Sequence, residues 1–249
     1  INIANINQPI KNTLYYIRQF AADALILYSD FEKQFIKTSK KKVFIANNTI
    51  NQYAYKLDNS SPEDLRNKYN INYKKVVLFV GRVQQRKRVD LLLEIFEKDI
   101  KDHALLIIGP EMPYNYKQTI DQNENIYYLG PVYDLKKLSE IYTLSSIFCI
   151  PGEVGLGINE AFLFGLPIVT SYIRPTSEIE LLLKNKVNGF LFQEGNKDDL
   201  KDKLILLLEN DGYYNKFSNN ASESFRKKAK IEYMFEGFFN SIKFVLKDE

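Results

Sequence analysis

Short apolar runs recur along the chain at wide spacing, each bounded by Gly, Pro, Asn or Ser. Apolar runs of this length between turn formers are typical of buried strands. Eight runs fit this description: 24–29, 42–47, 76–81, 104–109, 126–130, 147–151, 167–171 and 189–192. We predict a strand in each.

The segments between these runs have the apolar spacing of helices, and some open with Asp, Ser or Pro at a cap or first-turn position. They are 62–69, 89–98, 135–144, 156–164, 177–185 and 198–209. Alternating strands and helices predict an α/β fold, a doubly wound, Rossmann-like parallel sheet. From residue 211 onward the strand signal stops, and two helices are expected.

The polar stretch 51–61 interrupts this rhythm and is interpreted as a linker. Before it, residues 1–50 predict a helix (12–22), two strands and a short helix (30–37), too little to bury a core alone. We therefore expect the tail of a preceding domain, followed by a main domain over 62–229 and a terminal helix over 230–249.

Composition narrows the class of protein. The 249 residues are 45% apolar and 26% charged, typical of a globular chain, and a net charge of +3 does not by itself indicate a polyanionic partner. One Cys and one His exclude an internal disulfide and argue against a common zinc site. With no apolar run of ~18 residues and no signal-peptide pattern, we expect a cytoplasmic protein, leaving open peripheral association with the inner face of the membrane.

The most informative stretch is PGEVGLGINEAFLFGLPIVTS, residues 151–171. Gly152, Gly155 and Gly157 let backbone N–H groups approach a ligand closely, and the following helix N-terminus favours an anion. Glu160 lies among apolar neighbours, where an unpaired carboxylate is unfavourable, so it must face a protein partner or a ligand with hydroxyl donors. An anion beside a polyol suggests a nucleoside diphosphate and its sugars.

A second cluster follows an earlier strand. Gly81 and Arg82 end that strand, and Lys87 comes just before a helix. An Arg that binds two oxygens and a Lys that acts as a point charge suit a diphosphate, although a solvated basic loop is the alternative. Because ligands of open parallel sheets bind at the carboxyl ends of strands, the loops at Gly81, Gly109, Gly130 and 152–157 should converge on one crevice.

The order of these segments, FVGR with Lys87, LLIIGPE, NIYYLGPV, the 151–171 block and SEIELLLKNKVNGFLF, resembles the donor-binding half of glycosyltransferase family 4. The resemblance covers roughly residues 62–245 and implies a GT-B architecture of two Rossmann-like domains. Residues 22–50 are similar to the stretch where such enzymes cross from the acceptor domain to the donor domain.

The resemblance implies roles for individual residues. Arg82 and Lys87 would hold the donor diphosphate, and Glu160 the ribose hydroxyls. Backbone amides of Gly155, Leu156 and Gly157 would lie near the phosphates or the transferred sugar. The loop of Gly130, Pro131 and Val132 would lie against the base. Glu178 begins a helix that is often near the site, with a cap or surface role as the alternative.

Two positions depart from the family pattern. Gly152 stands where the family has the first of two glutamates, and Glu153 follows one place late. Glu153 either holds a donor-sugar hydroxyl, completing a catalytic set with Arg82 and Lys87, or is a solvated turn residue. Arg88 stands where a Gly commonly follows the lysine, and is either a phosphate ligand or exposed.

The resemblance implies a retaining transferase without a metal or further cofactor. Its donor would be a nucleotide-sugar such as a UDP- or GDP-sugar, and its acceptor a glycan or lipid-linked glycan. A nucleotide-sugar-binding subunit, or an inactive or truncated homologue needing a partner chain, is the alternative. In that case apolar Phe235, Phe238, Phe239 and Phe244 would be exposed and favour a homodimer or partner chain.

Other function classes fit less well. The single His103 opens a strand and Cys149 lies within one, so both are interpreted as structural, which weakens a hydrolase. No G-x-G-x-x-G follows a strand, which counts against a dinucleotide-dependent oxidoreductase. The tyrosines fall mostly within strand and helix patterns, so we expect no nucleic-acid partner.

Overall fold

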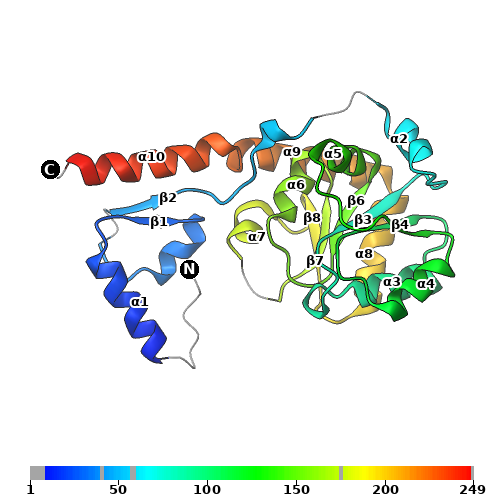
Figure 1. Ribbon diagram of the computed structural model, residues 1–249, viewed down its shortest axis with the longest axis horizontal. Coiled ribbons are helices and arrows are strands. Elements are labelled where there is room, and N and C mark those ends of the chain that lie inside the picture. Colours follow the sequence, from blue (N-terminus) through cyan, green and yellow to red (C-terminus); the bar gives the residue numbers. More distant parts are fainter. Residues whose placement is uncertain (1–8, 40–41, 57–59, 174–175, 248–249) are drawn as a thin grey trace.

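The computed structural model describes residues 9–39, 42–56, 60–173 and 176–247. The remaining parts of the predicted N-terminal tail, linker, main domain and terminal helix lie outside the described residues. A large parallel sheet with helices on both faces lies beside a small sheet and a long helix (Figure 1). The assignment of residues 1–50 to a preceding domain stays a prediction.

The large sheet has six parallel strands in the order β5-β4-β3-β6-β7-β8. Their bounds are β3 Val76–Val80, β4 Ala104–Ile108, β5 Ile126–Tyr128, β6 Ile147–Ile150, β7 Ile168–Ser171 and β8 Gly189–Phe192. The chain builds outward from β3 to β5, returns to β6 and builds outward again. The strand order therefore reverses between β3 and β6, and the doubly wound fold is confirmed.

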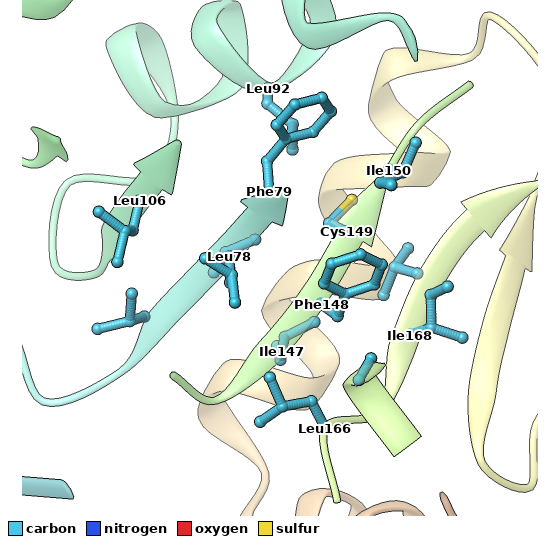
Figure 2. Packing of buried hydrophobic residues seen from close by; sticks show 14 of the residues in the cluster. Leu78, Phe79, Leu92, Leu106, Ile147, Phe148, Cys149, Ile150, Leu166 and Ile168 are labelled. Atoms are coloured by element: carbon cyan, nitrogen blue, oxygen red, sulfur yellow. The ribbon is translucent and has the colours of Figure 1, made fainter. Parts of the chain in front are cut away.

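The central strands are buried on both faces. Leu78, Phe79, Phe148 and Cys149 have no exposed surface, and their side chains alternate between the two sides of the sheet (Figure 2). Strands covered on both faces need continuous apolar sequences, which is why these runs were recognisable.

Helices cover both faces of this sheet (Figure 1). On one side lie α3 Val89–Lys98, α4 Tyr114–Asp121 and α8 Lys197–Glu209. On the other lie α2 Pro62–Lys68, α5 Leu135–Leu144, α6 Gly157–Leu163, α7 Ser177–Leu182 and α9 Asp211–Lys228. Among the described residues, no helix combines the length and apolar character needed to span a bilayer.

The small sheet consists of β1 Leu25–Leu27 and β2 Val43–Ile45, paired in parallel and preceded by α1 Pro9–Ala21. The terminal helix α10 Ile231–Lys247 packs on both strands (Figure 1). Gly237 permits this close approach, because a Cβ there would lie 2.0 Å from the carbonyl oxygen of Ile45. The ring centroids of Phe44 in β2 and Phe244 in α10 lie 5.4 Å apart.

The chain crosses between the two parts twice, and the crossings lie side by side. Asn47 Nδ2 donates to the carbonyl oxygen of Lys228 at 2.9 Å. Thr49 Oγ1 donates to the carbonyl oxygen of Ala229. The outgoing and returning segments are thus bonded to each other.

Several elements differ from the sequence-based expectation, among them three helices. The helix expected at 30–37 is a 3₁₀ helix, η1 Asp30–Phe35, and the helix expected at 177–185 ends at Leu182. The helix α4 was not predicted, because Ile120 is its only buried residue and its apolar pattern is correspondingly weak.

Candidate functional site

Three glycines lie next to one another at the carboxyl ends of β3, β4 and β5. Gly81 N–H donates to the carbonyl oxygen of Ile108 at 2.9 Å, and Gly109 N–H donates to that of Gly130 at 3.0 Å. Gly109 has a φ of +152°, and a Cβ there would lie 1.8 Å from the Gly81 carbonyl oxygen. The backbones therefore meet directly, and this edge of the sheet presents main chain rather than side chains.

The loop 82–88 leaves this edge and leads into α3, and we call it the cationic loop. Its backbone is tied to the next strand end, since Val83 N–H donates to the carbonyl oxygen of Pro110 at 3.1 Å. The Arg82 side chain is 66% exposed, and its Nη1 lies 4.0 Å from Glu111 Oε1. A weak, solvated pairing of this kind leaves the guanidinium accessible to an anionic ligand.

Lys87 is held differently, at the end of the 3₁₀ helix η4 Gln85–Lys87. Its ammonium is half-buried and donates to the backbone carbonyl oxygen of Glu153. Burial lowers the pKa of Lys87, and the nearby Arg86 lowers it further, whereas Glu153 opposes this shift. A poorly solvated cation with a neutral acceptor interacts favourably with an incoming anion.

Gly152 explains how the cationic loop reaches the loop that follows β6. Gly152 N–H donates to the carbonyl oxygen of Lys87 at 3.1 Å, and Glu153 N–H donates to that of Arg86 at 2.9 Å. A Cβ at position 152 would lie 2.0 Å from the Arg86 carbonyl oxygen. The position where the resembled family has a glutamate therefore has no room for a side chain in this arrangement.

Two hydroxyl groups at the carboxyl end of β7 hold the backbone that leads into the Gly152 turn. Ser171 Oγ donates to the carbonyl oxygen of Pro151 at 2.6 Å. Thr170 Oγ1 donates to that of Ile150 at 2.8 Å and lies 3.4 Å from that of Gly152. Sequence analysis did not identify these two hydroxyls, although their place at a strand's carboxyl end was a signal.

The side chain of Glu153 turns toward the cationic loop. Its Oε2 accepts from Arg86 Nη1 at 3.1 Å, and the side chain is 23% exposed. The Glu153 side chain is thus held by Arg86 and is not a freely solvated turn residue. The partner Arg86, which we had not singled out, belongs to the same basic run as Lys87.

Arg88 is committed to a neighbour. It has a left-handed φ of +55°, which favours Gly and is consistent with the glycine common there in the resembled family. Its Nε and Nη2 donate to the carboxylate of Asp90 at 2.9–3.1 Å, which raises the pKa of Arg88. Asp90 thus engages the guanidinium in a forked ion pair at the surface, where the Arg88 side chain is 33% exposed.

The glycine turn leads into α6. Leu156 is 40% exposed, and α6 begins at Gly157, where a Cβ would lie 2.9 Å from the ring of Phe148. Gly155 has open space at its Cβ position. The amides of Ile158 and Asn159 donate to the carbonyl oxygens of Gly155 at 3.4 Å and Leu156 at 2.8 Å, so this turn closes on its own backbone beyond the carboxyl end of β6.

Glu160, one turn into α6, has two protein partners. Tyr142 Oη donates to its Oε2 at 2.8 Å, and Tyr55 Oη donates to its Oε1 at 2.5 Å. The pKa of each hydroxyl is raised, by burial first and then by the carboxylate, so both stay protonated donors. Sequence analysis foresaw the need for such donors but missed these two, since nothing distinguishes them among 17 tyrosines.

The loop after β5 is more open. Gly130 has a φ of +70°, Pro131 is exposed and Val132 is half-buried. The following Tyr133 is 81% exposed. The loop therefore presents backbone and an aromatic ring at the same edge as the other glycines.

Of the remaining candidates, Glu178 lies at the start of α7, which follows the carboxyl end of β7, whereas His103 and Cys149 lie away from this edge. Glu178 accepts from Asn48 Nδ2 at 2.6 Å, while Thr176 caps α7. His103 immediately precedes β4, at the opposite end of the strand from Gly109. Cys149 is buried within β6, which raises the pKa of its thiol.

A separate cavity of about 590 Å³ lies between the small sheet, α7 and α10. Ser29, Phe44, Glu180 and Lys228 are among its lining residues. These elements do not carry the glycine turns, so we place the candidate site at the carboxyl edge of the large sheet, near its switch point.

Residues 61–224 match the family described as Glycosyl transferases group 1. The chain belongs to this family. A glycosyltransferase of Haemophilus influenzae, itself uncharacterized, is 28% identical over 238 residues, which cover 88% of this chain and 66% of that protein. The O-antigen biosynthesis glycosyltransferase WbnH of Escherichia coli is 26% identical over 191 residues, covering 76% of this chain and 52% of WbnH.

Solved structures agree on the fold of this group 1 chain. Anabaena HepE in complex with UDP superposes with a TM-score of 0.78 at 17% identity, covering 96% of this chain and 68% of HepE. The architecture is that of GT-B glycosyltransferases. The chain spans about two thirds of the length of the Haemophilus relative and about half of WbnH.

Proposed function

We propose that this chain is the donor-binding part of a retaining, metal-independent glycosyltransferase of the family 4 type. The observation that carries the proposal is the contact between the cationic loop and the Gly152 turn. It places half-buried Lys87 beside a glycine turn and a helix N-terminus, where a diphosphate finds both charge and amide donors.

The proposed reaction needs no nucleophile from the protein. The bond between the donor sugar's anomeric carbon and the diphosphate oxygen breaks, and its electron pair stays on the leaving phosphate. The acceptor hydroxyl bonds to the anomeric carbon on the same face, and its proton passes to the leaving phosphate. Arg82 and Lys87 stabilise the charge that develops on this phosphate, a task that fixed cations perform without reorganising.

We further propose a nucleotide-sugar as donor and a surface glycan, or its lipid-linked precursor, as acceptor. HepE binds UDP, which makes uridine the first base to test. WbnH acts in O-antigen biosynthesis, which favours a glycan acceptor. In this arrangement Gly130, Pro131 and Val132 lie against the base, and Glu160 meets the ribose.

A binding panel tests the proposal. UDP, GDP, ADP and their sugars are each added to the protein, and the melting temperature and calorimetric Kd are measured. We expect one base to raise the melting temperature, since ligand at ~100 times its Kd adds about 2.7 kcal/mol of stability. If none of these nucleotides binds at millimolar concentration, the proposed function is wrong.

A second candidate is a donor-binding subunit that needs a partner chain for the acceptor domain. The apolar face of α10 favours it: Phe235, Phe238 and Phe239 are 63%, 37% and 45% exposed, whereas Phe244 packs on Phe44. The rings of Phe235 and Phe239 stack on this exposed face of α10, with their centroids 5.7 Å apart. Exposed apolar area of this kind favours association.

We therefore expect the chain to self-associate as its concentration rises, measured as molar mass by light scattering. Replacing Phe235 and Phe239 with Ser should shift the mass back toward the monomer, because the stacked pair is lost. Replacing the exposed Tyr114 of α4 with Ser is the matched control and should change nothing. A monodisperse monomer at high concentration would contradict this candidate.

A further inference from the structure

We call residues 51–55 the strap, because they form hydrogen bonds with both α10 and α6. It contains the 3₁₀ helix η3 Gln52–Ala54, capped by the Asn51 side chain, which accepts from the amide of Tyr53. Gln52 Oε1 accepts from the amide of Ile231 at 3.0 Å, and its Nε2 donates to Glu232 at 3.0 Å. The strap is thus anchored on the first turn of α10, and Tyr55, its last residue, directly follows η3.

Tyr55 reaches from the strap to the carboxylate of Glu160. Its ring meets Phe164 edge-on at 5.9 Å, and Phe164 stacks on the buried ring of Tyr142 at 5.2 Å. The two hydroxyls then bind different oxygens of Glu160, at 2.5 and 2.8 Å. Two donors on opposite oxygens fix both the position and the rotation of the carboxylate group.

This arrangement leaves acceptor capacity on Glu160. An ionised carboxylate has about four lone-pair sites, and two phenolic donors use two of them. A vicinal diol donates two hydrogen bonds to one carboxylate when the oxygens are correctly oriented. A carboxylate already fixed by other groups loses less conformational entropy when it binds such a diol.

We infer that Tyr55 is a positioning residue for the donor's ribose: through its hydroxyl, the strap orients Glu160 for the 2′- and 3′-hydroxyls. The inference rests on the proposed function, in which Glu160 meets the ribose. It adds a residue outside the sheet domain to the donor site. Tyr55 contributes to the recognition of ribose rather than of phosphate or base.

The test compares a ribonucleotide with its 2′-deoxy analogue by calorimetry. UDP and 2′-deoxy-UDP are used, or the corresponding pair for the base that the panel selects. We expect the protein to prefer the ribonucleotide. Tyr55→Phe should weaken ribonucleotide binding by roughly tenfold, near the lower end of the effect of a charged hydrogen bond, and should weaken binding of the 2′-deoxynucleotide, which keeps only the 3′-hydroxyl, by clearly less.

The matched control is Tyr69→Phe. Tyr69 Oη donates to Glu140, a buried carboxylate between α2 and α5, at 2.7 Å. The variant therefore loses the same type of hydrogen bond away from the candidate site, and it should leave the ribose preference unchanged. Tyr55→Phe keeps the ring contact with Phe164, so we expect it to fold, as checked by circular dichroism.

A second variant keeps the test decisive. Glu160→Gln should lose the same preference, and adding Tyr55→Phe to it should cause little further loss, because both changes act on one contact. Equal weakening of both nucleotides by Tyr55→Phe, or tighter ribonucleotide binding, would overturn the inference. Equal binding of both nucleotides by the unmodified protein would also overturn it while leaving the diphosphate site intact, whereas no nucleotide binding at all would refute the proposed function itself.

Discussion

Replacing Lys87 with Ala should slow glycosyl transfer by roughly 10²–10³-fold, the range found when one fixed electrostatic donor is removed from an active site. The variant removes a half-buried cation that water does not replace efficiently, because the surrounding loops hold their positions through backbone hydrogen bonds. Arg82→Ala should have an effect in the same direction. Release of the nucleoside diphosphate measures the rate, and calorimetry measures the Kd.

Lys74→Ala provides the matched control, because this exposed lysine lies just before β3, at the opposite end of that strand. Burial lowers the pKa of Lys87, so its positive charge is lost at a lower pH than that of an exposed lysine. Diphosphate binding by the unmodified protein should accordingly weaken as the pH rises, and this dependence should disappear in Lys87→Ala. If Lys87→Ala transferred sugar at a rate within about threefold of that of the unmodified protein, the proposed role of Lys87 would be contradicted.

Replacing Gly152 with Ala should weaken nucleotide binding by at least about tenfold and lower the free energy of unfolding by about 1–3 kcal/mol, as overpacking does. The new Cβ would lie 2.0 Å from the carbonyl oxygen of Arg86 and 2.9 Å from the carbonyl carbon of Lys87. The cationic loop must then move away and carry Lys87 with it. Displacements of about 1 Å in a site are enough for large functional losses.

Gly155→Ala is the control for stability, because its Cβ has open space within 4 Å. Its free energy of unfolding should change by less than ~0.5 kcal/mol. Denaturant unfolding and calorimetry measure the two effects of Gly152→Ala. If Gly152→Ala left both the free energy of unfolding and the nucleotide affinity unchanged, the contact between the cationic loop and the loop after β6 would not depend on the absence of a side chain at position 152.

The large sheet was predictable because its strands are buried on both faces. Each of them, from β3 to β8, lies within an apolar run recognised in the sequence, and α3 and α5 have the predicted bounds. The helix α4 gave no such signal, since a helix that buries one side chain has almost no periodic pattern. Contacts of η1 with distant residues, such as the hydrogen bond between Glu32 and Ser177, leave no pattern in the local sequence.

The candidate site was predictable only in part. Strand ends and glycines located its edge, because parallel strands bring their carboxyl ends together. The contact between Gly152 and the cationic loop was not predictable, since it is made by backbone atoms and by the absence of a side chain. The tyrosines at 55 and 142 were missed because they lie 87 positions apart and meet only through Glu160.

The paired crossings at Asn47–Thr49 and Lys228–Ala229 constrain how the molecule can bend. η1 reinforces these two tethers, because it packs on α7, where Ser177 Oγ donates to Glu32 at 2.7 Å. Since α10 is seated on β2 by the close approach at Gly237, this helix and the small sheet must turn as one body.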